Sequence, residues 1–117
     1  MHNKISVWFI FINNIDYILK NIDIIKEITD DIHIYVRKKI KDKNILDILS
    51  KYNVKIDYKN NQGIKYIFKE SKYDWSIILE KELFLTNDDI KFIYDNIKFS
   101  NECINKDKYF LLKNNIE

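Results

Sequence analysis

The chain has 117 residues, of which 46% are hydrophobic and 15% are aromatic, so it is long and apolar enough to bury one core and unlike a disordered chain. Its 20 Lys and Arg against 18 Asp and Glu give a formal net charge of +2. The two signs are interleaved along the chain, which argues against a broad basic surface for nucleic acid.

Strand and helix patterns alternate along most of the chain. In order, they predict a strand at residues 5–12, a helix at 15–25, a strand at 32–36, a helix at 45–52, a strand at 54–58, a helix at 64–71, a strand at 75–79 and a helix at 87–97. The remaining tail can add a strand near residues 108–112.

Each kind of element rests on a different pattern. Residues 5–12 and 75–79 are continuous apolar runs, typical of strands covered on both faces. Residues 54–58 alternate between apolar and polar, which indicates a half-buried edge strand. The helices repeat apolar residues at every third or fourth position. Asp42 or Asn44 can cap the second helix, and Thr86 or Asn87 can cap the fourth. All four are residue types favoured as N-caps.

The order β-α-β-α-β-α-β-α predicts a three-layer α/β fold, with a mostly parallel, Rossmann-like sheet between helices on both faces. We expect residues 1–98 to form this domain and residues 99–117 to be a C-terminal tail that packs on it. A central first strand, with the second and third strands on one side and the fourth on the other, gives the strand order 3-2-1-4. Ligands of such sheets bind beyond the carboxyl ends of the strands where the order reverses, here between strands one and four.

Cysteine is scarce in the chain. Cys103 is the only cysteine, which excludes an intrachain disulfide and a cysteine-rich zinc site.

The apolar run at residues 5–12 is too short to span a bilayer, and no small-residue cleavage site follows it. We therefore expect a cytoplasmic protein of a bacterium, a virus or a host cell, without a transmembrane segment. The bias towards Ile, Lys and Asn, with no Ala or Pro, indicates an AT-rich genome.

Three stretches carry a resemblance to a known family. Residues 5–14, ISVWFIFINN, are similar to the motif SVIIPxYN. Residues 36–52 are similar to VDDGSxDxSxxILxxY, and residues 60–90 to NxGxxxARNxGIxxAxGDYIxFLDxDDxLxxDxL. These motifs belong to the GT-A-fold family 2 glycosyltransferases, which the chain resembles over about residues 4–98. The matching positions are Ser6, Val7, Asn13, Val36, Asp42, Ile48, Leu49, Tyr52, Asn61, Gly63, Asp74, Ile78, Leu79, Glu80 and Glu82.

The resemblance implies the nucleotide-sugar-binding half of a GT-A transferase. The positions that it assigns to the nucleotide sugar are Asn13, Asp42, Asn61 and Gly63. It aligns Glu80 and Glu82 with the metal-binding DxD motif, so that Mn²⁺ or Mg²⁺ would bridge these carboxylates to the diphosphate. No catalytic residue is assigned, because the family's acceptor-binding half, with its catalytic carboxylate, has no counterpart in the chain.

Three functions remain open. The first is a metal-dependent, glycosyltransferase-like protein (hexosyltransferase-type) whose acceptor site comes from a second copy or a partner chain. The second is a catalytically degenerate relative that serves as an interaction or structural module; Arg37 and Lys38 replace the family's paired acids after the second strand. The third and weakest is an unrelated flavodoxin-like or receiver-like domain, for which Asn13, Asp16 and Asp57 are poorly placed.

Each candidate residue also has a purely structural interpretation. Glu80 and Glu82 can mark the point where a strand leaves the core and enters a solvated loop. Asn13 can be the polar exit from the first strand, and Gly63 can serve a plain turn. His33, inside a short strand, is more often a packed histidine than a ligand or a base.

Overall fold

The structure is a computed structural model that describes residues 5–11, 15–36, 39–58, 63–79, 84–99, 104–105 and 110–113. Its elements are β1 (Ile5–Phe11), α1 (Asp16–Ile25), β2 (Ile32–Val36), α2 (Lys43–Leu49), β3 (Lys55–Tyr58), α3 (Gly63–Glu70), β4 (Trp75–Leu79), α4 (Asn87–Phe99), β5 (Ile104–Asn105) and β6 (Phe110–Lys113). The eight expected elements are all present in the expected order, and β6 lies where the tail was expected to add a strand.

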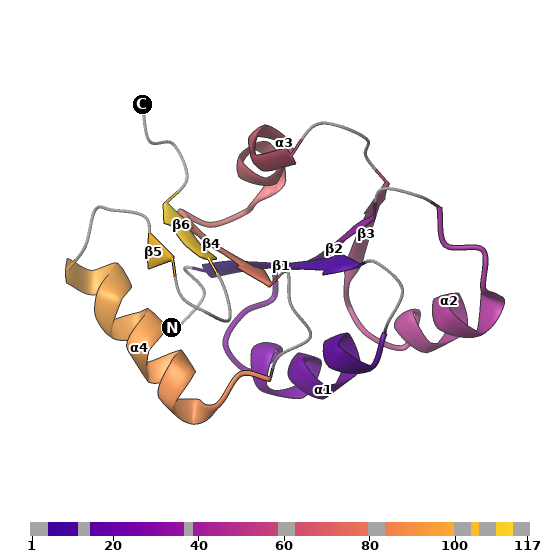
Figure 1. Cartoon of the computed structure of the whole chain (residues 1–117), viewed down its shortest axis with the longest axis horizontal. Helices are drawn as coiled ribbons and strands as arrows, with labels where there is room; N and C mark the ends of the chain where they lie inside the picture. Colours follow the sequence, from indigo (N-terminus) through magenta and orange to yellow (C-terminus); the bar gives the residue numbers. More distant parts are fainter. Residues whose placement is uncertain are drawn as a thin grey trace.

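The sheet has the strand order β3-β2-β1-β4-β6-β5 (Figure 1). Strands β3, β2, β1 and β4 run parallel to one another, which confirms the predicted order 3-2-1-4. Strand β6 runs antiparallel to both β4 and β5. The fold is therefore a three-layer α/β fold whose parallel part is extended on one side by the tail.

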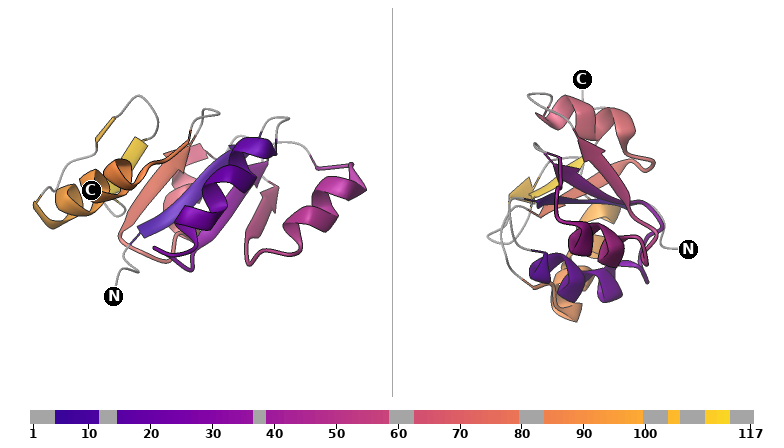
Figure 2. Two further views of the ribbon diagram at one scale, coloured as in Figure 1. Left: turned by 90° about the horizontal axis from the view of Figure 1, so that it is seen from below. Right: turned by 90° about the vertical axis from the view of Figure 1, so that its right-hand side faces the viewer.

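Helices cover both faces of the sheet. Helix α3 lies on one face, and α1, α2 and α4 lie on the other (Figures 1 and 2). Successive side chains of a strand point to opposite faces. In β1, Ile5, Val7 and Phe9 belong to the larger core cluster, and Trp8 belongs to a smaller cluster with Tyr66 of α3. This double coverage explains why β1 and β4 read as continuous apolar runs.

Side-chain hydrogen bonds join α1 to the segment before α4 and cap the start of α4. Asn21 of α1 is 1% exposed; its amide nitrogen donates to the Tyr17 carbonyl and its oxygen accepts from the Leu85 N–H at 2.7 Å. Just beyond, Thr86 and Asp89 exchange hydrogen bonds at the start of α4, where each side chain accepts from the other's backbone N–H. Thr86 is thus the cap of α4, as expected.

Strand β3 is the half-buried edge strand that its alternating sequence predicted, with Lys55 and Tyr58 exposed and Ile56 and Asp57 intermediate. In the described part of the chain, no helix is long and apolar enough to cross a membrane.

Candidate functional site

The carboxyl edge of the sheet between β1 and β4 is the topological switch point. These two strands are parallel neighbours, and Phe9 of β1 pairs with Leu79 of β4. From β1 the chain continues to β2 and β3 on one side, whereas β4 lies on the other side. The crevice beyond the carboxyl ends of such strands is where open α/β sheets bind ligands.

Six residues were predicted to form a site at this edge. Four of them, Asn13, Asn61, Glu80 and Glu82, lie outside the described residues, as do Arg37 and Lys38. The two that are described, Asp42 and Gly63, each stand at the start of a helix that follows a parallel strand.

Asp42 is the N-cap of α2. Its carboxylate Oδ1 accepts a hydrogen bond from the Asn44 backbone N–H at 2.8 Å, and the side chain is exposed. This is the capping role that the sequence predicted, and it satisfies one of the free N–H groups at the helix start.

Gly63 opens α3 in the left-handed backbone region, with a φ of +52°. Its N–H donates to the Tyr35 hydroxyl at 3.3 Å, which ties the start of α3 to β2. A Cβ added at Gly63 would meet no atom within 4 Å. The backbone angle, and not a lack of space, is therefore what makes glycine suitable here.

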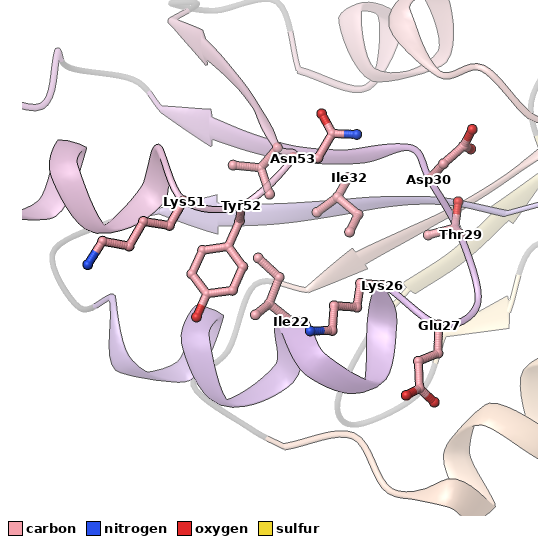
Figure 3. Close-up of a pocket in the computed structure, with 10 residues that line it drawn as sticks. Ile22, Lys26, Glu27, Thr29, Asp30, Ile32, Lys51, Tyr52 and Asn53 are labelled. Carbon is pink, nitrogen blue, oxygen red and sulfur yellow. The ribbon is translucent and has the colours of Figure 1, made fainter.

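A hollow of about 410 Å³ lies at the opposite edge of the sheet (Figure 3). It is lined by the end of α1, by the residues before β2 and by the segment that leads into β3. Thr29 and Asp30 precede β2, and Asn53 and Val54 precede β3, so the hollow sits at the amino ends of these strands. It is thus separate from the carboxyl edge.

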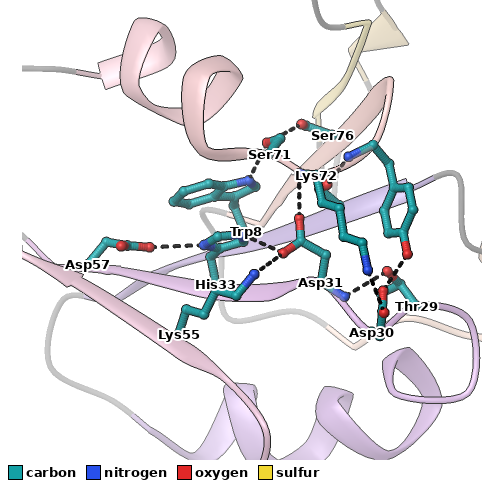
Figure 4. A network of polar contacts seen from close by, with 12 residues as sticks. Trp8, Thr29, Asp30, Asp31, His33, Lys55, Asp57, Ser71, Lys72 and Ser76 are labelled. Atoms are coloured by element: carbon teal, nitrogen blue, oxygen red, sulfur yellow. Dashed lines mark hydrogen bonds and ion pairs between the residues drawn. The ribbon is translucent and has the colours of Figure 1, made fainter.

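A buried polar network is centred on His33 of β2, beneath α3 (Figure 4). The His33 side chain is 2% exposed, and each of its ring nitrogens meets a carboxylate. Nδ1 lies 2.9 Å from Asp57 Oδ2, and Nε2 lies 2.8 Å from Asp31 Oδ1. Both ring nitrogens are therefore within hydrogen-bond distance of a carboxylate oxygen.

Asp31 collects donors from three parts of the chain. Besides His33, Lys55 Nζ lies 2.8 Å from Oδ1 and the Lys72 N–H donates to Oδ2 at 2.8 Å. Burial raises the pKa of this carboxyl. The hydrogen bonds from His33 and Lys55 lower it by more than burial raises it, so the net pKa lies well below its usual range. Asp31 is therefore a buried anion held by its partners.

The other carboxylate of the network, Asp57, is held by α3. The Tyr66 hydroxyl donates to Asp57 Oδ1 at 2.8 Å. Burial, and then this hydrogen bond, raise the pKa of the Tyr66 hydroxyl. The edge strand β3 is thus tied both to β2, through His33, and to the helix above it.

Trp8 of β1 closes the network from above. Its Nε1–H donates to the Ser71 hydroxyl at 2.8 Å, and Ser71 Oγ lies 2.8 Å from Ser76 Oγ of β4. Ser71 itself donates to the Ile67 carbonyl at 2.6 Å, so its single proton is used. Among the described residues, no buried side-chain nitrogen or oxygen lacks a hydrogen-bond partner.

The network ties β2, β3 and α3 together. Both nitrogens of His33 face carboxylates and the ring is closed to solvent. This agrees with the expectation of a packed histidine. Within the described ranges, no three Asp, Glu, His or Cys side chains form a group that could hold a metal ion.

The polar residues of β2 and β3 are the sequence pattern that indicates this network. His33 pairs with Lys55 in the register of β2 and β3, and Asp57 follows two residues later on the same face. Polar side chains at alternate positions of two neighbouring strands indicate a shared polar patch.

Comparison with known proteins adds no family to this description. No protein-family model matches the chain. No curated protein matches its sequence.

Proposed function

We propose that the chain is a glycosyltransferase-like domain that binds a nucleotide sugar, with a divalent cation, at the carboxyl edge between β1 and β4. The observation that carries the proposal is the parallel strand order 3-2-1-4, which is the order that the sequence resemblance required. It makes β1 and β4 neighbours, and these are the two strands after which the resemblance has its key positions.

The proposal joins this topology to the chain's own residues. Asn13 comes two residues after the end of β1, and Glu80 directly follows Leu79 at the end of β4. A nucleotide diphosphate carries several negative charges, so two carboxylates can take part in its binding only through a cation. Mn²⁺ and Mg²⁺ prefer oxygen ligands and commonly bind carboxylates together with substrate phosphates. In the proposal, Glu80 and Glu82 hold this cation.

Asp42 and Gly63 have supporting roles in the proposal. Asp42 fixes the start of α2 through its cap, and Gly63 fixes the start of α3 through its backbone angle and its bond to Tyr35. Both helices begin after parallel strands end, so their starts lie on the carboxyl side of the sheet.

Isothermal titration calorimetry tests the proposal. UDP-glucose and GDP-mannose are titrated into the protein with and without Mn²⁺, using the wild type and the double variant Glu80→Ala/Glu82→Ala. We expect Mn²⁺-dependent binding that the double variant loses. Glu70→Ala, which removes an exposed carboxylate at the end of α3, is the matched control and should bind as the wild type does. Absence of binding of either nucleotide sugar to the wild type would reject the proposal.

The alternative is a catalytically degenerate module of the same fold that serves protein interactions or a structural role. Arg37 and Lys38 favour it, because the family's base-binding acids are missing at these positions. A folded wild-type protein that ignores both nucleotide sugars would support this alternative. If the first proposal holds, we place the activity in the cytoplasm, with the acceptor site supplied by a second copy or by a partner chain.

A further inference from the structure

Thr29 and Asp30 form the back wall of the hollow at the amino ends of β2 and β3 (Figure 3). Thr29 Oγ1 donates to the Ile5 carbonyl at 2.6 Å and accepts from the Asp31 N–H at 3.0 Å. Asp30 is held by the Lys72 ammonium at 2.8 Å and by the Tyr73 hydroxyl at 2.5 Å. Thr29 is therefore fixed by buried hydrogen bonds to β1 and to its own turn, whereas Asp30 is paired with the segment before β4 at the surface.

The floor and one side of the hollow are apolar. Ile22 of α1 and Ile32 of β2 are buried, and Val54 is half-buried beside them. Tyr52 adds a half-buried aromatic ring, and its backbone is fixed because its N–H donates to the Leu49 carbonyl and its carbonyl accepts from the Val54 N–H, both at 3.0 Å. Such a surface favours a flat apolar ligand, and a volume of about 410 Å³ is in the usual range of ligand pockets.

Two lysines, Lys26 and Lys51, line the hollow together with Glu27 and Asp30. Asp30 is already matched by Lys72, whose hydrogen bond is the main cause that lowers the Asp30 pKa. The Glu27 carboxylate points away from the apolar floor, whereas the Lys26 ammonium extends beside Ile22 towards the Tyr52 ring (Figure 3). Lys26 has one ion pair, 3.2 Å from Asp23, and both side chains are more than half exposed. A pair of this kind contributes little and is readily exchanged for a ligand.

We propose that this hollow is a second binding site, for a small planar aromatic carboxylate. The ring lies on the Ile22–Ile32–Val54 floor against Tyr52, and the carboxylate pairs with Lys26. Asn53, whose exposed amide has no partner among the described residues, offers a further hydrogen bond at the rim. The site is independent of the nucleotide-sugar proposal, since the two occupy opposite edges of the sheet.

Amide NMR of ¹⁵N-labelled protein tests the inference with 4-hydroxybenzoate as the probe. We expect saturable shifts confined to residues 26–32 and 51–54. Lys26→Gln should weaken binding about tenfold, as the loss of roughly one charge-assisted contact predicts. Tyr52→Leu, which keeps an apolar side chain, should weaken it as well. Lys69→Gln, on the exposed side of α3 and the other face of the sheet, is the control and should bind like the wild type.

The neutral analogue 4-hydroxybenzamide separates charge recognition from simple stacking. It should bind at least several-fold more weakly than the carboxylate. Equal affinities of the two compounds, shifts outside the two segments, or no saturable shift at all would each overturn the inference. A negative result in this experiment would not affect the nucleotide-sugar proposal, because Glu80→Ala/Glu82→Ala and Lys26→Gln report on different sites.

Discussion

The imidazole of His33 stacks flat on the indole of Trp8, with ring centroids 3.9 Å apart and planes within 5° of parallel. Trp8 is completely buried and Tyr66 meets it edge-on, at 80°. The two carboxylates at its nitrogens hold the imidazole in this stacked position. The face beneath α3 is thus organised around a polar ring, whereas the opposite face carries the larger hydrophobic core.

Replacing this ring should be costly. His33→Leu would leave Asp31 and Asp57 without their shared donor, and Asp31 is fully buried. Removal of one member of a buried charged group costs about 3 kcal/mol or more. Urea unfolding should show a loss of this size, against a change within about 0.5 kcal/mol for Asp95→Asn, which removes only the exposed Lys91 pair. Similar small losses in both variants would mean that the network does not hold the fold together.

Stability should fall in acid because of Asp31. Its pKa in the folded protein is lowered by the donors that outweigh burial, whereas its unfolded value is about 3.9. The stabilisation is therefore complete above about pH 4 and is lost as the pH falls through and below that value. We expect the urea midpoint of the wild type to drop between about pH 4 and pH 2, and Asp31→Asn, less stable at neutral pH, to show a smaller drop. Parallel acid profiles would assign the acid sensitivity to other groups.

Ser71 offers a cleaner test of a single buried hydrogen bond. Ser71→Ala would leave the buried Trp8 Nε1–H without a partner, at a cost of about 2 kcal/mol. Ser50→Ala is the matched control, since Ser50 Oγ donates to the Asp47 carbonyl at an exposed site. Thermal unfolding should separate the two variants clearly. If Ser71→Ala were no worse than Ser50→Ala, the indole would not depend on Ser71.

The backbone angle at Gly63 predicts a graded response. Gly63→Ala places a Cβ in open space, so its cost comes from the left-handed backbone, about 1 kcal/mol. Gly63→Asn should cost less, because asparagine tolerates this region, and Gly63→Val should cost more. Unfolding free energies of the three variants measure the order. An alanine variant as stable as the wild type would show that α3 can start without a positive φ.

The fold could be predicted because each element left its own pattern. Double coverage by helices produced the continuous apolar runs of β1 and β4, and the strand–helix alternation required crossover connections and parallel pairing. β5, with two residues, is too short to leave a pattern. The polar network was missed because it depends on register. Asp31 directly precedes β2. It contacts Lys55 and Lys72 only once the strands are aligned, and no local sequence pattern predicts these two contacts.

The candidate site was predictable to a different degree. Asp42 was recognised from its residue type and position before an apolar-periodic helix, and the cap is present. Gly63 was expected at a turn, and it has the positive φ that glycine adopts readily. Neither observation establishes a ligand, because a cap and a turn have sufficient structural reasons of their own. The assignment to a nucleotide sugar therefore rests on the topology and on a test at the strand ends.

Paramagnetic broadening by Mn²⁺ is the most direct measurement of that assignment. With UDP-glucose present, Mn²⁺ should broaden the amide signals of Phe11 and Leu79, at the carboxyl ends of β1 and β4, and spare Ile5 and Trp75, at their amino ends. The ends of the seven-residue β1 are about 20 Å apart and those of the five-residue β4 about 13 Å, so the broadening should fall along each strand from its carboxyl to its amino end. The effect should vanish in Glu80→Ala/Glu82→Ala. Broadening centred on Ile5 and Trp75, or none that depends on UDP-glucose, would contradict a nucleotide-sugar site at this edge.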